Sequence, residues 1–381
     1  MKKKTFVTIF EKIQNVHLTK DVGQIAYFMH KVLNYESRLV GHKIDKSYSY
    51  LDSEVRGLKL DLLPRLKIGR ISLSLTYYLI MNAKKIDVLH LFHHATKTYF
   101  YIWLYKLLNK KGIVYLKSDV VVIGLNEYKS FINPKYKLRN LFFRKVIDSI
   151  DIISVETQYV YNLVQEIYPN YKEKFLYLQN GLDLKKSYEY SNPMPFNKKE
   201  NIIMTVGRIG THQKNNEVLL ESISKIDLKD WKVYLIGPIE KDFEDYIISY
   251  FKKFPLLKDK VIFTGNISNK KDLYDFYNRS KIFCLTSRDE SFALVYVEAI
   301  AYGNYILSTD VGAIEDITKK QKLGKVFKDE EELTKYLKYY MQNQGILEEN
   351  YQNAVKHAND NFNWSSIVNK LEGRIKEIEK Q

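Results

Sequence analysis

The sequence alternates short apolar runs with longer amphipathic stretches, and it does so in two series. In the first half the apolar runs cover residues 4–10, 86–93, 111–119 and 150–157, and helical patterns cover 23–36 and 100–111. The runs are rich in β-branched residues and largely uninterrupted by polar ones, which is typical of parallel strands buried on both faces. We therefore expect an α/β fold with crossover helices.

The second series begins after residues 182–200, which contain two prolines and no periodicity and are expected to form a linker. The predicted strands are 201–208, 231–238, 260–267, 281–287 and 305–310, and the predicted helices are 215–226, 270–280, 292–302 and 363–380. Alternation in both halves predicts two doubly wound, Rossmann-like domains. The expected division is 1–181, 182–362 and a C-terminal helix over 363–381.

The charge is divided unevenly between the halves. Residues 1–180 hold 29 Lys+Arg and 15 Asp+Glu, a net of +14, whereas residues 181–381 hold 31 and 30, a net of +1. The basic half could face an anionic membrane, a nucleic acid or an anionic substrate. The alternative is a lysine-rich surface without a specific partner.

The cysteine count and the hydropathy of the sequence indicate where in the cell the protein is expected. The single cysteine, Cys284, lies in the apolar run 281–287 and is expected to be buried, which favours a reducing, cytoplasmic setting. The longest nearly apolar run, 71–81, is shorter than the roughly 20 residues that span a bilayer. We expect a soluble protein or one peripheral to the inner face of the cytoplasmic membrane.

The loop after the first strand of the second series combines a glycine with cations. Gly207 ends the run, and Arg208 and Lys214 follow closely. Ligands of open α/β sheets bind beyond the carboxyl ends of the strands, and two cations beside a glycine suit a phosphate. A helix-capping turn with surface cations would give the same pattern.

The stretch "RDESFALVYVEAIAYG" (288–303) places two glutamates around an apolar helix. The helix is expected to start near Phe292 and to stop at Gly303, which leaves the amides of 292–295 for an anion. Glu290 is expected in the loop and Glu298 on the helix, both facing one cleft. A ribose diol would satisfy the embedded Glu298 carboxylate; a buried pair with Lys or Arg is the alternative.

Two further loops and one histidine cluster are weaker indications of a ligand or metal site. The glycine turn in 307–317 could keep a cleft open, and Gly23 could let the backbone approach a phosphate or sugar. His90, His93 and His94 lack an accompanying acidic or cysteine ligand, and no Asp-x-Asp occurs. No metal is expected.

Taken in order, the motifs of the second half resemble those of the family 4 glycosyltransferases. "TVGRIGTHQKN" resembles the Gly-Arg…Lys diphosphate clamp, "ESFALVYVEAIAYG" the E-x7-E motif, and "STDVGAIEDI" the glycine loop that follows. "NFNWSSIVNKLEGRI" resembles the closing helix that returns to the first domain, and "LQNGLD" the domain junction.

The resemblance implies a GT-B fold, two Rossmann-like domains facing a central cleft, and metal-independent, retaining transfer from a UDP- or GDP-sugar to an acceptor hydroxyl without a cofactor. It implies catalytic roles for Glu290 near the donor sugar and for Arg208 and Lys214 at the diphosphate. The donor-binding residues implied or expected are Glu298, Gly207, Ser291, Phe292, Ala293, Leu294, Val295, Gly23, Lys117 and Asp119.

This chain departs from the family pattern at three places. Glu-Ser-Phe-Ala at 290–293 replaces Glu-Gly-Phe-Gly, and Gly23 alone represents a usual glycine pair. Lys117, with Asp119 two residues on, stands where many members have a histidine, so Lys117, His93 or His94 could contact the donor sugar.

The basic first half is expected to bind the acceptor. Residues 131–150 alternate cations with apolar residues at helical spacing, which suits an anionic membrane surface and a lipid-linked or cell-surface polysaccharide acceptor; a core-packing helix is the alternative. Other activities left open are a nucleotide-sugar epimerase or phosphorylase of the same fold and, from another class, a basic nucleic-acid-binding protein, although no nucleic-acid motif is present.

Overall fold

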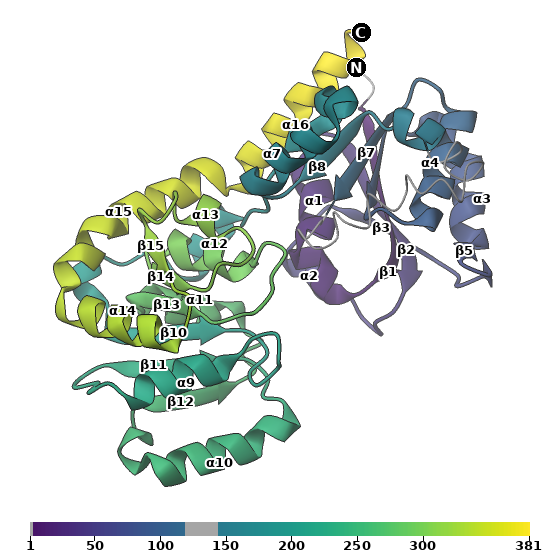
Figure 1. The fold of residues 1–381 in the computed structure, drawn as a ribbon. Coiled ribbons are helices and arrows are strands. Elements are labelled where there is room, and N and C mark those ends of the chain that lie inside the picture. Colours follow the sequence, from purple (N-terminus) through teal and green to yellow (C-terminus); the bar gives the residue numbers. More distant parts are fainter. Residues whose placement is uncertain (1–2, 119–143) are drawn as a thin grey trace. The chain divides into compact units, whose positions relative to one another are not determined.

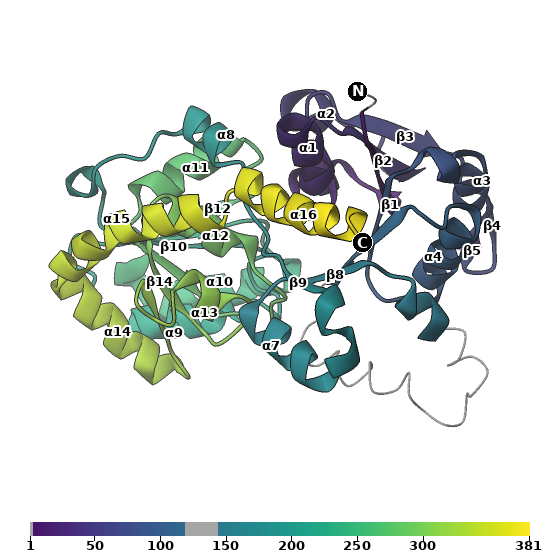
Figure 2. The same cartoon turned by 90° about the horizontal axis from the view of Figure 1, so that it is seen from above.

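A computed structural model describes residues 3–118 and 144–381 of the chain. The chain forms two compact units (Figures 1 and 2): unit 1 comprises residues 1–180 and 364–381, and unit 2 comprises residues 181–363. Residues 131–143 of the predicted membrane-facing stretch and Asp119 lie outside the described residues.

Unit 1 is built on a seven-stranded sheet with the order β3-β2-β1-β6-β7-β8-β9. All of its strand pairs are parallel. The strands are β1 Thr5–Ile13, β2 Glu36–Lys43, β3 Lys59–Leu63, β6 Val88–Phe92, β7 Ile113–Ser118, β8 Ile152–Val155 and β9 Phe175–Tyr177, and the short β4 Lys67–Ile68 and β5 Ile71–Ser72 form a separate antiparallel hairpin.

Helices cover both faces of this sheet. One face packs against α1 and α16 through Phe28 and Leu371, and the other against α3 and α4 through Leu79 and Ile102. The helices are η1 Asn15–Thr19, α1 Asp21–Leu33, α2 Tyr50–Ser53, α3 Leu73–Asn82, η2 Ala83–Lys85, α4 Thr96–Leu108, α7 Gln158–Ile167, η5 Pro169–Lys174 and α16 Trp364–Glu379.

Unit 2 is built on a six-stranded sheet with the order β12-β11-β10-β13-β14-β15, again parallel throughout. The strands are β10 Ile202–Val206, β11 Lys232–Ile236, β12 Val261–Gly265, β13 Ile282–Leu285, β14 Tyr305–Ser308 and β15 Gly324–Val326. The residues of β10, β13 and β14 are nearly all buried, as predicted for strands covered on both faces, whereas most residues of the edge strands β12 and β15 are partly exposed.

The helices of unit 2 form two layers around this sheet. Leu219 of α9 and Leu337 of α14 pack on one face, and Tyr277 of α11 and Val297 of α12 pack on the other. The helices are α8 Leu184–Tyr190, η6 Phe196–Lys198, α9 Asn216–Ser224, η7 Lys241–Phe243, α10 Glu244–Lys253, η8 Pro255–Leu257, α11 Lys270–Arg279, α12 Leu294–Ala301, α13 Ile314–Ile317, α14 Glu330–Gln342 and α15 Gln344–Asn361.

The stretch 182–200 is not a featureless linker. It contains α8, and the Asp183 side chain caps that helix by accepting a hydrogen bond from the Lys186 amide at 3.2 Å. Tyr188 of α8 donates to the Ala301 carbonyl at 3.0 Å. The prediction failed because the helix is too short to show a period, whereas its capping residue and its packing decide its structure.

Candidate functional site

The loops after β10 and β13 lie side by side, because these strands are neighbours in the sheet of unit 2. The Arg288 amide donates to the Gln213 carbonyl at 2.8 Å, and the Thr286 hydroxyl donates to the Lys214 carbonyl at 2.9 Å. These bonds hold two segments about 75 residues apart in sequence at the carboxyl edge of the sheet, where ligands of such folds bind.

Lys214 and Glu290 form the charged centre of this site. The Lys214 Nζ lies 2.5 Å from Glu290 Oε1, and the Ser287 hydroxyl donates to the same oxygen at 2.8 Å. Both charged side chains are largely buried, with 15% and 11% of their area exposed. Gly207 leaves room for the lysine stem, because a Cβ there would lie 3.1 Å from Lys214 Cε.

Arg208 stands at the exposed rim of the same loop. Its Nη2 donates to Gln213 Oε1 at a long 3.4 Å, and Gln213 Nε2 donates to the Asp289 carbonyl at 2.8 Å. The guanidinium is thus held near Lys214 by a weak bond that an anion could replace. Lys214 contacts Glu290 directly, whereas Arg208 is linked to the loop of Glu290 only through Gln213.

The helix after Glu290 starts later than predicted. α12 begins at Leu294 rather than near Phe292, because Ala293 adopts the left-handed conformation with φ 64° and forms the cap. The amides available at the helix start are accordingly those of 293–295. Gly303 has φ 71° just past the helix, in the left-handed region that favours glycine.

The glycine loop after β14 packs directly on this cap. Gly312 has φ 60°, and a Cβ there would lie 2.9 Å from the Phe292 carbonyl oxygen and 3.2 Å from Glu290 Cβ. The Ala313 amide donates to the same carbonyl at 3.2 Å. A larger residue at position 312 would displace the segment that carries Glu290.

Glu298 lies on α12 and is held by a group that the sequence did not reveal. Its Oε2 accepts a hydrogen bond of 2.8 Å from the hydroxyl of Tyr277, a buried residue of α11. Burial raises the pKa of Glu298, and the Tyr277 bond and the charge of Lys270 oppose that rise. Among the described residues, neither a lysine nor an arginine forms an ion pair with Glu298. Its hydrogen-bond donor is Tyr277, whereas Glu290 accepts from Ser287.

Gly23 and Lys117 belong to unit 1. Gly23 lies inside the first turn of α1 rather than in a turn before a helix, and a Cβ there would lie 2.5 Å from the Leu18 Cα. Lys117, at the end of β7, is buried and forms an ion pair with Glu156; its Nζ also lies 3.5 Å from Asp21 Oδ2. Asn180 Nδ2 donates to Glu156 at 2.7 Å.

The three histidines occupy different environments. His90 is buried, stacks on Tyr115 with ring centroids 4.4 Å apart, and shares a 3.0 Å hydrogen bond with Thr8; burial, with a contribution from Lys117, lowers its pKa well below the usual value. His93 has φ 58°, and His94 Nδ1 bonds the Tyr99 hydroxyl at 2.8 Å.

In the described ranges, no group of three or more His, Cys, Asp or Glu side chains is arranged to hold a metal.

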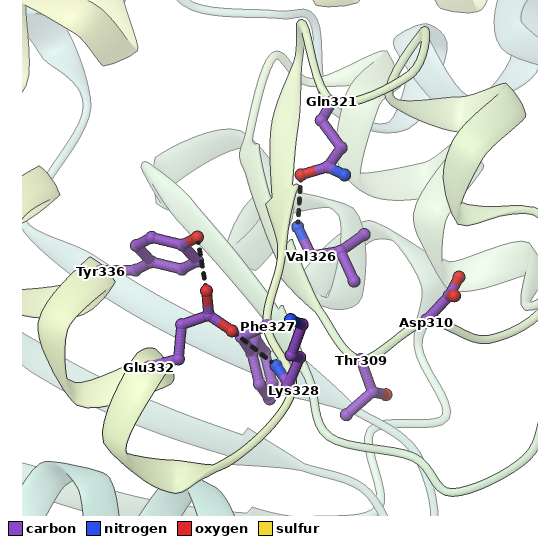
Figure 3. Close-up of a pocket in the computed structure, with 8 residues that line it drawn as sticks. All are labelled: Thr309, Asp310, Gln321, Val326, Phe327, Lys328, Glu332 and Tyr336. Atoms are coloured by element: carbon purple, nitrogen blue, oxygen red, sulfur yellow. Dashed lines mark hydrogen bonds between the residues drawn. The ribbon is translucent and has the colours of Figure 1, made fainter.

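A cavity of about 560 Å³ opens beyond β14 and β15 (Figure 3). Glu332 spans part of its wall by accepting bonds from the Lys328 amide at 2.8 Å and the Tyr336 hydroxyl at 2.9 Å. None of the predicted site residues lines it. It adjoins the site through Thr309, whose hydroxyl donates to the Ser287 carbonyl at 2.6 Å.

The sequence of unit 2 matches a known family. Residues 187–358 match the family model described as "Glycosyl transferases group 1". The matched part of the chain, which lies within unit 2, is similar to this family. A curated relative, the amylovoran biosynthesis glycosyltransferase AmsD of Erwinia amylovora, is 26% identical over an alignment of 174 residues. The alignment covers 40% of this chain and 48% of AmsD. The alignment thus spans about half the length of that relative.

Solved structures match over both units. A glycosyltransferase from Rickettsia africae has a TM-score of 0.74 at 16% identity and covers all of both chains. HepE of Anabaena, solved in complex with UDP-glucose, has a TM-score of 0.66 at 12% identity, with 98% of this chain and 99% of HepE covered. These likenesses confirm the predicted GT-B fold. Among the described residues, no helix is both long and apolar enough to cross a bilayer.

Proposed function

We propose that the chain transfers a sugar from a nucleotide-sugar to an acceptor hydroxyl with retention of the anomeric configuration, and without a metal. The observation that carries this proposal is the contact of Lys214 with Glu290, which lies in the loop before α12, together with Arg208 in the same loop as Lys214. Two cations and a helix N-terminus can stabilise the negative charge that develops on a leaving diphosphate. In this scheme Lys214 exchanges its contact with Glu290 for the diphosphate when donor binds.

The remaining site residues receive proposed roles from their contacts. Glu298 offers Oε1 to the ribose hydroxyls while Tyr277 holds Oε2. Amides at 293–295 bind the diphosphate. Glu290, released from Lys214, contacts the donor sugar near its anomeric carbon. Gly23, Lys117 and Asp119 are retained as proposed donor contacts from unit 1.

The proposed transfer does not require a separate base to accept the proton of the acceptor hydroxyl. The acceptor oxygen forms a bond to the anomeric carbon as the bond from that carbon to the diphosphate oxygen breaks on the same face. The acceptor proton passes to the departing diphosphate. The chain's own contribution is to orient the donor and to stabilise the diphosphate charge.

For the acceptor we propose a lipid-linked or cell-surface polysaccharide intermediate, such as a capsule precursor, met at the inner face of the cytoplasmic membrane. The net charge of +14 in residues 1–180 supports an anionic partner. The similarity to AmsD, an amylovoran biosynthesis glycosyltransferase, supports a polysaccharide product. Residues 131–150 remain a proposed membrane contact; of these, 144–148 are helical with Arg144 and Lys145 exposed.

Product analysis with a panel of UDP- and GDP-sugars tests the reaction. Glu298→Ala should weaken donor binding, whereas Glu290→Ala should mainly lower the transfer rate of bound donor. NMR of the product should show the anomeric configuration of the donor. Normal transfer rates in both variants would contradict the site, and release of free sugar and nucleotide without acceptor transfer would contradict the reaction.

A further inference from the structure

The outer face of unit 1 carries an unusual concentration of exposed apolar side chains. Of the fifteen large hydrophobic side chains exposed in the described part of the chain, eight come from the β4–β5 hairpin, α3 and α4. These eight are Leu66, Ile68, Leu73, Tyr77, Ile80, Met81, Trp103 and Leu107. Single exposed apolar residues are ordinary, but a grouped set of this size marks an interaction surface.

The exposed side chains of α3 form one stripe. An α-helix turns about 100° per residue, so positions 73, 77, 80 and 81 fall within an arc of about 100°. Leu75 and Leu79, on the opposite side, are buried in the core against α4. α3 therefore has one apolar face toward the sheet and a second toward solvent, with Tyr77 65% exposed.

The hairpin and α4 extend the stripe on either side. The Leu73 amide donates to the Leu66 carbonyl at 2.9 Å, which joins the hairpin to the start of α3. Asn109, just past α4, donates to the Ala83 carbonyl at 2.9 Å and so joins the ends of the two helices. Figures 1 and 2 both place α3, α4 and the hairpin beside one another.

Cations flank both ends of this apolar surface. Between Asp61 and Asp87 the sequence has five basic residues and no acidic one, and no acidic residue follows until Asp119. The exposed basic residues at the hairpin and at the helix ends are Arg65, Arg70, Lys84, Lys85, Lys110 and Lys111.

Two carboxylates on strands of the same sheet already have partners. Glu11 pairs with both Lys67 and Lys97, which lower its pKa to about 2 against the opposing effect of burial. Asp61 pairs with Arg38 at 3.2 Å. The surface is therefore apolar in its middle and positive at its edges.

We infer that the α3–α4 surface, defined as the eight apolar residues and six cations above, docks on an anionic lipid bilayer. Exposed leucine, isoleucine and methionine suit the headgroup boundary, and tyrosine and tryptophan are favoured there. A second copy of this chain is disfavoured, because a two-fold interface would oppose cations with cations. A nucleic acid would account for the cations but not for the apolar stripe.

This inference rests on the membrane part of the proposed function and not on the transfer chemistry. It names a surface separate from residues 131–150. Vesicle binding measured without donor or acceptor therefore tests it independently of the proposed reaction.

The full chain is floated with vesicles made of equal parts phosphatidylglycerol and phosphatidylcholine, and with vesicles of phosphatidylcholine alone. Wild-type protein should float with the anionic vesicles only. Replacing four cations (Arg65→Gln, Arg70→Gln, Lys84→Gln, Lys85→Gln) should lower the partition coefficient by about 100-fold or more, since each cation near such a surface contributes about fivefold. Replacing Tyr77→Ser, Ile80→Ser and Met81→Ser should also abolish flotation.

The matched control removes exposed groups from unit 2. Ile248 and Leu256 are 67% and 91% exposed, and Lys252 and Lys253 are exposed beside them. A variant with both apolar residues changed to Ser and both lysines to Gln should float like wild type. Flotation of the α3 variants at wild-type level would overturn the α3–α4 surface, and no flotation of wild type would overturn the membrane contact as a whole.

Trp103 supplies a second readout that does not depend on folding yield. It is 40% exposed, whereas Trp231 and Trp364 are buried. Anionic vesicles should shift the tryptophan emission to shorter wavelength, brominated lipid should quench it, and Trp103→Phe should remove both effects. A concentration-dependent dimer that forms without lipid and is lost in the α3 variants would instead assign the surface to a second copy and overturn the lipid assignment.

Discussion

The hydrogen bond from Tyr277 to Glu298 leads to a prediction in which the effect depends on pH. Tyr277→Phe removes one hydroxyl from a buried ring and leaves Glu298 Oε2 without its 2.8 Å donor. A hydrogen bond to a charged acceptor contributes about 1.5–3 kcal/mol, and a neutral one about 0.5–1.5 kcal/mol. The loss of unfolding free energy should therefore be about 1–1.5 kcal/mol larger when Glu298 is ionised than when it is protonated, and so larger at high pH than at low pH.

The direction in which stability changes with pH follows from the direction of the pKa shift of Glu298. Burial raises the pKa of Glu298 in the folded state, so folding favours its protonated form, and stability falls as pH rises through the folded-state pKa. Tyr277 opposes this rise, so the pKa should rise further in Tyr277→Phe and the loss of stability should extend to higher pH.

Urea unfolding at pH 5 and pH 8 measures this difference. Trp231, buried in unit 2, reports on the unit that contains the bond. The control is Tyr250→Phe, which removes a neutral bond to the Leu220 carbonyl and should cost the same at both pH values. An equal loss for Tyr277→Phe at the two pH values would refute a change in the charge of Glu298 between pH 5 and pH 8.

Other substitutions test the local geometry. Ala293→Gly should raise the unfolding free energy by about 0.5–1 kcal/mol, seen as a higher urea midpoint, because alanine is strained at φ 64°; an unchanged midpoint would contradict that strain. Gly237→Ala should sharply reduce the yield of folded protein, since a Cβ there would lie 1.7 Å from a backbone oxygen, whereas Gly345→Ala meets open space and should fold normally. Lys117→Met should destabilise unit 1 by about 3–5 kcal/mol by leaving the buried Glu156 without its cation, and adding Glu156→Gln should recover much of that loss in thermal unfolding; no recovery would argue against the pair.

The strands were predictable where burial on both faces made them apolar throughout. β10 and β13 follow directly from their sequences, as does the burial of Cys284, whose thiol pKa is raised by that burial. β2 was missed because its sequence, ESRLVGHK, mixes charged and apolar residues, although four of its central positions are buried. Its place in the sheet comes from pairing with β1 and β3, which no local pattern encodes.

The contact of Lys214 with Glu290 was predictable because the two residues lie in the loops that follow the neighbouring strands β10 and β13. Tyr277 was not, since it reaches Glu298 from a separate helix and looks like one more core aromatic residue in the sequence. The start of α12 was misplaced because the left-handed conformation of Ala293 is imposed by packing and is not a preference of alanine.

The central claim is that Arg208 and Lys214 bind the diphosphate of a nucleotide-sugar on unit 2. Its most direct test is isothermal titration of the full chain with UDP- and GDP-sugars. We expect one donor to bind, and Arg208→Ala with Lys214→Ala to weaken it by about 100-fold or more, since each charge-assisted bond contributes about 1.5–3 kcal/mol. The exposed pair Lys252→Ala with Lys253→Ala is the charge-matched control and should leave the affinity unchanged. Equal affinity in the Arg208/Lys214 variant and wild type would contradict the account.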